Sequence, residues 1–104
     1  MKEKFLEGVR LFNQGLYFEA HEIWEEAWND AEGVEKRFLQ ALIQIAVAYL
    51  KWQSEIPGGA KKMYALATER LAALPDRCLG LDVRCVERDF KAAFPAKKLN
   101  ISSS

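Results

Sequence analysis

The chain has 104 residues, with 15 cationic and 15 acidic side chains, so its formal net charge at neutral pH is zero. Half of the residues are hydrophobic and 12% are aromatic, which predicts one packed domain and argues against disorder. The balanced charge gives no indication of a nucleic-acid partner or of binding to an anionic membrane surface.

The N-terminus and the cysteines predict a cytoplasmic protein. The first ten residues are charged and contain no apolar stretch of the kind found in a secretory signal. The two cysteines, Cys78 and Cys85, are too few for a disulfide framework, so we expect them to be reduced thiols. Their role is not indicated by their spacing.

Apolar residues recur with a helical period from the start of the chain. The first helix is predicted from about Glu3 to Asn13, and Gly15 stands where a glycine often ends a helix. The second helix is predicted from about Tyr17 to Asp30, with its stop near Gly33. The short connection between them resembles the turn between the paired helices of a tetratricopeptide repeat, without the repeat itself.

The second half of the chain continues the helical pattern. The third helix is predicted from about Val34 to Ser54, and the fourth follows Pro57, an acceptable early helical residue, as far as about Leu74. A weaker fifth helix is predicted with Asp82 as its N-cap. Its apolar face is predicted to carry Val83, Val86, Phe90 and Phe94, with Pro95 at its end.

The predicted fold class is therefore all-α, an antiparallel bundle of four to five helices, with no β-strand. Residues 1–95 are expected to form a single all-helical domain, and residues 96–104 a frayed C-terminal tail.

The third helix is the most apolar segment of the chain. Its middle, Phe38 to Leu50, contains only two polar residues, both glutamines, and is too short to be a transmembrane span. At about 100° per residue, four polar residues fall in one narrow stripe along this helix. They are Arg37, Gln40, Gln44 and Lys51. Everything else in the middle of the helix is expected to be buried.

The stripe has two interpretations. It is either the solvated side of a mostly buried helix, or it faces the second helix and forms a polar site there. In the second case the amides and cations of the stripe would provide hydrogen-bond partners for a carboxylate and an imidazole of the second helix. Such groups are costly to bury without partners.

The second helix carries the only histidine of the chain, within the segment Asn13 to Trp28. His21 and Glu25 are four residues apart, close enough to hydrogen-bond on one side of a helix, and Glu22 follows His21 directly. This spacing aims two metal-binding groups in the same direction, and imidazole with carboxylate suits zinc, manganese or iron. A structural His–Glu hydrogen bond and a metal-free ligand site are the two other interpretations.

Three segments together resemble the domain-of-unknown-function 309 family of small all-helical bacterial and archaeal proteins. The segments read LFNQGLYFEAHEIWEEAW, RFLQALIQIAVAYLKWQ and GGAKKMYALATERLAAL, and they cover most of residues 11–74. The family is sometimes labelled as predicted metal-dependent hydrolases. The resemblance therefore implies an all-helical fold and a hydrolase that uses a divalent metal. Many relatives carry a second histidine near the position of Lys51, where this chain has none.

Two functional hypotheses follow. In the first, an enzyme or binding protein holds a small-molecule ligand between the second and third helices. His21, Glu22 and Glu25 would be catalytic residues, and His21 with Glu25 would hold any metal. The residues expected to bind the substrate are Arg37, Gln40, Gln44, Lys51 and Trp28.

In the second hypothesis, the same polar cluster is structural. The protein would then act as an interaction or assembly module through its surface, with a protein partner or as a homodimer.

Overall fold

The computed structural model describes residues 2–93. Its five helices are α1 (Lys2–Asn13), α2 (Tyr17–Asp30), α3 (Gly33–Gln53), α4 (Pro57–Ala72) and α5 (Val83–Ala93). Two short strands, β1 (Arg77–Cys78) and β2 (Leu81–Asp82), lie between α4 and α5. The prediction of an all-α bundle is confirmed for this part of the chain. Phe94, Pro95 and the predicted tail lie outside the described residues.

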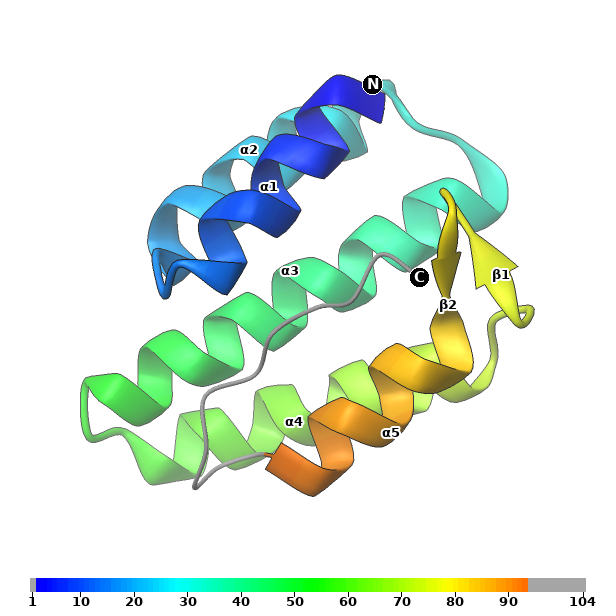
Figure 1. Ribbon diagram of the computed structural model, residues 1–104. Helices are drawn as coiled ribbons and strands as arrows, with labels where there is room; N and C mark the ends of the chain where they lie inside the picture. The colour runs from blue at the N-terminus through cyan, green and yellow to red at the C-terminus, as the bar shows by residue number, and fades with distance from the viewer. Residues whose placement is uncertain (1, 94–104) are drawn as a thin grey trace.

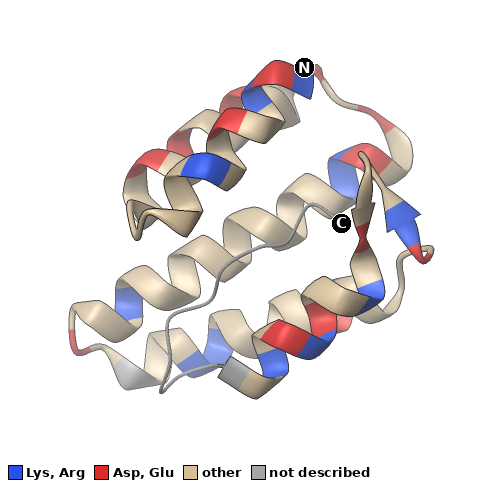
Figure 2. Ribbon diagram, viewed as in Figure 1, with Lys and Arg blue, Asp and Glu red and all other residues tan. Residues whose placement is uncertain are grey.

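The helices form two antiparallel pairs on either side of α3. In Figure 1, α1 and α2 pack as a hairpin against one side of α3, and α4 returns along its other side. The helix α5 packs on α4. Since α3 is covered from two directions, it needs an apolar surface around most of its circumference. Its charged residues accordingly lie only towards its two ends (Figure 2).

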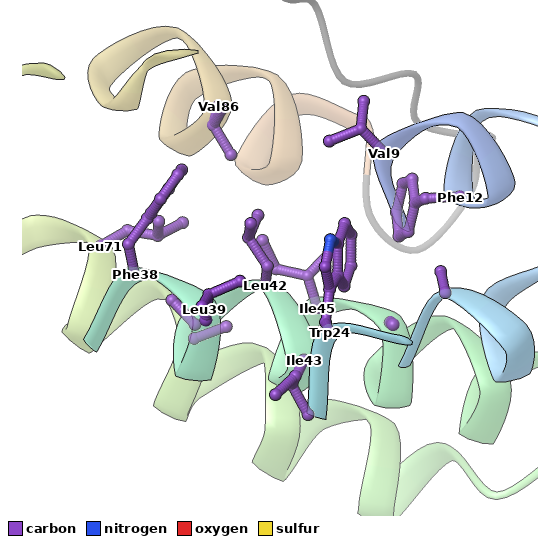
Figure 3. Packing of buried hydrophobic residues seen from close by; sticks show 14 of the residues in the cluster. Val9, Phe12, Trp24, Phe38, Leu39, Leu42, Ile43, Ile45, Leu71 and Val86 are labelled. Carbon is purple, nitrogen blue, oxygen red and sulfur yellow. The ribbon is translucent and has the colours of Figure 1, made fainter. Parts of the chain in front are cut away.

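The core is built mainly from α3 and the residues that face it. Trp24, Phe12 and Phe38 are fully buried in it, together with Leu42 and Ile45 of α3 (Figure 3). The ring centroids of Phe12 and Trp24 lie 5.8 Å apart, so α1 and α2 meet through aromatic contacts.

Tyrosine contacts fix the register of α2 on α3. The Tyr17 and Tyr49 rings stack with centroids 5.1 Å apart, and burial raises the pKa of both phenols. Because α2 and α3 are antiparallel, this contact places the start of α2 beside the end of α3.

Gly15 ends α1 in the way its position predicts. Its φ is +84°, and its N–H donates to the carbonyl of Phe12 at 2.9 Å. The N–H of Leu16 donates to the carbonyl of Leu11 at 3.0 Å, which completes a Schellman motif. At the other helix junction the prediction needs correction, since Gly33 does not stop α2 but begins α3.

The prediction that the chain has no strand is wrong. Strands β1 and β2 pair in an antiparallel hairpin, with Arg77 opposite Asp82. The two residues of the turn, Leu79 and Gly80, have φ of +53° and +81°, as type I′ hairpin turns require. Strands of two residues are too short to show an alternating pattern, which is why the sequence does not reveal them.

The predicted N-cap of the fifth helix is confirmed. The N–H of Cys85 donates to Oδ1 of Asp82 at 3.1 Å, and this hydrogen bond lowers the pKa of the Asp82 carboxyl. Both cysteines are free thiols, as predicted. Burial, with a smaller contribution from Glu35, raises the pKa of the Cys78 thiol. Within residues 2–93, no helix has the length and apolar character needed to cross a membrane.

Candidate functional site

His21 and Glu25 form a close pair on α2. The Nε2 atom of His21 lies 2.7 Å from Oε1 of Glu25. The His21 side chain is 21% exposed and that of Glu25 is 54% exposed, so the pair runs from the helix seam outwards to the surface. The Phe18 ring flanks the imidazole with centroids 5.8 Å apart.

The polar stripe of α3 changes from exposed to buried along the helix. Arg37 is exposed and Gln40 is half-buried, whereas Gln44 keeps only 8% of its surface exposed. Gln44 is the only buried polar or charged residue in the described part of the chain. The stripe is therefore not simply the solvated side of α3.

Two buried polar atoms near the seam have no hydrogen-bond partner among the described residues. They are Nδ1 of His21 and Oε1 of Gln44. When Nε2 of a neutral imidazole carries the proton, Nδ1 is an acceptor, and an amide oxygen is always one. Both atoms can therefore accept a hydrogen bond. Unpaired buried polar groups are costly, so each of these atoms needs a hydrogen-bond donor that the described residues do not supply.

Three hollows lined by described residues lie along α3. The first, the α2 hollow, has a volume of about 280 Å³ and lies between α2 and α3. The second, the middle hollow, has about 230 Å³, and the third, the α4 hollow, about 280 Å³. The α2 hollow is lined by Glu25, Trp28, Asn29, Gln40 and Ile43. The middle hollow is lined by Trp28, Lys36, Arg37, Gln40 and Arg70, and the α4 hollow by Arg37, Leu66, Glu69, Arg70, Ala73 and Leu74.

Shared residues join these hollows into one polar groove. Trp28 and Gln40 line both the α2 hollow and the middle hollow. Arg37 and Arg70 line both the middle hollow and the α4 hollow. The polar groove is the surface formed by the three hollows together. It runs from α2 across the N-terminal half of α3 to the end of α4.

The structure brings six of the predicted site residues to or beside the polar groove. Glu25, Trp28, Arg37 and Gln40 line it. His21 lies beside it, with its Nε2 atom 2.7 Å from Oε1 of Glu25. Gln44 lies one turn beyond Gln40 on the same face of α3 and does not line the three hollows. Its buried amide therefore lies beside the groove and not in it.

Two predicted site residues lie elsewhere. Lys51 belongs to the same angular stripe but lies at the far end of α3, where its Cδ would be 2.8 Å from a Cβ atom added at Gly59. Its aliphatic stem thus covers the start of α4. Glu22 is exposed, since one residue of rotation turns it about 100° away from His21. Neither residue lines the three hollows.

The polar residues of the groove that were not predicted are Lys36, Arg70, Asn29 and Glu69. Lys36 holds its Nζ atom 4.1 Å from the centroid of the Trp28 ring, a cation–π contact that positions the ammonium at the groove. Arg70 comes from α4, and Asn29 from the last turn of α2. The position of Lys36 next to Arg37 in the sequence could have indicated that it belongs to the site. Only the packing of α4 on α3 shows that Arg70 joins them.

Fold and groove together define a small helical protein with a polar groove along its central helix. The sequence of residues 5–63, more than half of the chain, matches the model of the family described as "Domain of unknown function (DUF309)". The chain therefore belongs to this family, as its resemblance implies. No curated protein matches the sequence.

The residues of the site do not fit a metal ion held by the protein. Within residues 2–93, no three side chains of His, Cys, Asp or Glu come together as a set of ligands. Nε2 of His21 lies 2.7 Å from Oε1 of Glu25, and no third ligand stands beside this pair among the described residues. Zinc sites in proteins need at least three protein ligands.

Replacing Gln44 with leucine should stabilise the protein by about 1 kcal/mol, because the change removes a buried acceptor without a partner and keeps the side-chain volume. Urea unfolding followed by circular dichroism measures the difference. Gln53→Leu is the matched control, since Gln53 is exposed on the same helix and should change stability by less than about 0.5 kcal/mol. A clear loss of stability in Gln44→Leu would mean that the amide supports the fold.

Proposed function

We propose that the protein binds a small polar organic molecule in the polar groove, without a metal ion. The observation that supports this most strongly is the sharing of residues between neighbouring hollows, which makes a continuous surface out of three small ones. Concave sites with a few convergent polar groups are where proteins bind small ligands.

The groups along the groove suit a ligand with several kinds of polar atoms. Glu25 offers acceptor oxygens, and Gln40 and Asn29 offer amides that both donate and accept. The unpaired acceptors of His21 and Gln44 lie beside this end of the groove, as the register of α2 on α3 indicates. In this proposal His21 orients the Glu25 carboxylate towards the ligand, and hydrolysis by a bound metal is not required.

A variant of Gln40 tests the proposed function because this residue lines two of the three hollows. Gln40→Leu should weaken the binding of small polar fragments about tenfold while changing stability by less than about 1 kcal/mol, since the side chain is only half-buried. The measurement is ligand-observed NMR with a set of neutral, cationic and anionic fragments.

Gln53→Leu again serves as the control, and its binding should equal that of the unchanged protein. The proposed function would be refuted by a fragment set in which nothing binds. It would be refuted equally by fragments that bind Gln40→Leu as tightly as the unchanged protein.

A second candidate function is self-association through one end of the bundle. Leu16, Phe18, Trp52 and Ile56 are exposed apolar residues around the α1–α2 and α3–α4 turns. The Tyr17–Tyr49 stack places these two turns at the same end of the molecule (Figure 1). Sedimentation velocity over a dilution series tests this candidate, and a concentration-independent monomer would rule it out.

A further inference from the structure

The middle hollow is the most basic part of the polar groove. Lys36, Arg37 and Arg70 line it together with Trp28 and Gln40, and no aspartate or glutamate does. None of the three cations forms an ion pair with another described residue. Three like charges around a hollow of about 230 Å³ repel one another, and a bound anion would relieve this repulsion.

The three cations come from two helices and approach the hollow from different sides. Lys36 is held over the Trp28 ring on the side of α2. Arg37 of α3 and Arg70 of α4 both line the middle hollow and the α4 hollow. Guanidinium groups bind planar carboxylates and phosphates with two parallel hydrogen bonds, so this pair provides directional recognition as well as charge.

The α4 hollow, next to the two arginines, has mainly apolar walls. Leu66, Ala73 and Leu74 line it, and Leu74 belongs to the buried core. Glu69 is its one acidic residue, so an anionic group is favoured in the middle hollow and disfavoured here. The volume of about 280 Å³ is large enough for a single aromatic ring or a short alkyl chain.

Building on the proposed ligand-binding function, we propose that the ligand is an organic anion with an apolar group. Its carboxylate or phosphate binds to Lys36, Arg37 and Arg70 in the middle hollow. Its apolar group lies against Leu66 and Leu74 in the α4 hollow. The two arginines stand between these parts of the ligand and set the orientation in which it binds.

Isothermal titration calorimetry at low ionic strength tests this proposal with four probes: phenyl phosphate, phenylacetate, benzyl alcohol and inorganic phosphate. The two aromatic anions should bind more tightly than benzyl alcohol, which lacks the charge, and phenyl phosphate more tightly than inorganic phosphate, which lacks the ring. The order of phenyl phosphate and phenylacetate tells which anionic group is preferred. Binding of both should weaken as salt is added.

Arg70→Gln should weaken the binding of the preferred aromatic anion tenfold or more, because a charged hydrogen-bond partner is lost. Lys62→Gln is the matched control. Lys62 is an exposed cation on the same helix that lines none of the three hollows, so its replacement makes the same change in net charge. Arg37→Gln should reproduce the effect of Arg70→Gln from the neighbouring helix.

The outcomes separate this inference from the function on which it rests. If benzyl alcohol binds as tightly as the anions, or if Arg70→Gln and Lys62→Gln weaken binding equally, the inference is refuted while a ligand-binding groove remains. If none of these probes binds and none of the wider fragment set binds either, both proposals fail. Fragments that bind only when neutral or cationic would also refute the inference alone.

Discussion

Trp24→Ala should destabilise the protein by about 3–5 kcal/mol, the cost of emptying a buried aromatic site. The Trp24 side chain is completely buried, and its Nε1–H donates to the carbonyl oxygen of Phe5 at 3.1 Å. Alanine would leave a cavity between α1 and α2 and a buried carbonyl without its donor. Urea unfolding followed by circular dichroism measures the effect.

The matched control is Trp52→Ala, because the Trp52 side chain is 38% exposed at the end of α3. Its replacement should cost clearly less than that of Trp24. If Trp24→Ala costs less than about 1 kcal/mol, α1 does not depend on this contact and the described packing of α1 on α2 is incorrect.

Gly8→Ala should destabilise the protein by about 3 kcal/mol, although alanine is the better helix former by about 1 kcal/mol. A Cβ atom at Gly8 would lie 2.6 Å from Cε2 of Trp24 and closer still to Nε1 and Cδ1. Because the indole is buried, it cannot move aside without disturbing the core. Thermal unfolding at one fixed pH measures the change.

Gly58→Ala provides the control for the helix propensity of alanine. Gly58 lies in the first turn of α4, and a Cβ atom there would meet nothing within 4 Å. This variant should be neutral or slightly more stable than the unchanged protein. A Gly8→Ala variant that behaves like Gly58→Ala would contradict the close contact between α1 and the indole.

The helices of the bundle could be predicted because each one carries a periodic apolar face and an identifiable end. The bounds of α2 agree with the prediction, and Gly15 and Asp82 lie at the helix ends that they indicate. Gly8 is a residue whose role could not be predicted from the sequence. In the sequence it is a glycine within a helix, and only the approach of α2 explains why it has no side chain.

The candidate site could be predicted in part. The angular stripe on α3 correctly placed Arg37 and Gln40 on one surface, and the spacing of His21 and Glu25 correctly indicated a pair. The helical wheel misplaced Lys51 because it ignores distance along the axis. Eleven residues separate Lys51 from Gln40, which is about 16 Å of helix.

The contribution of α4 to the polar groove could not be predicted from the sequence, for a different reason. Arg70 is one of several cations on α4, and its neighbours in sequence give no sign that it lines the same hollow as Arg37. Whether the two residues share a hollow depends on how α4 rotates and slides against α3, which is decided by packing over the whole interface. The basic centre of the groove therefore exists only in the folded chain.

The three tryptophans allow the most direct test of a ligand site in the groove. Trp28 lines the groove, Trp24 is fully buried in the core, and Trp52 lies at the end of α3. Their indole N–H groups give separate signals in a proton–nitrogen correlation spectrum, which can be recorded while phenyl phosphate is added. Movement of the Trp28 signal with saturation, while the Trp24 and Trp52 signals stay in place, is the predicted result. A Trp28 signal that does not move at saturating ligand, or movement of the Trp52 signal alone, would contradict a ligand site in the polar groove.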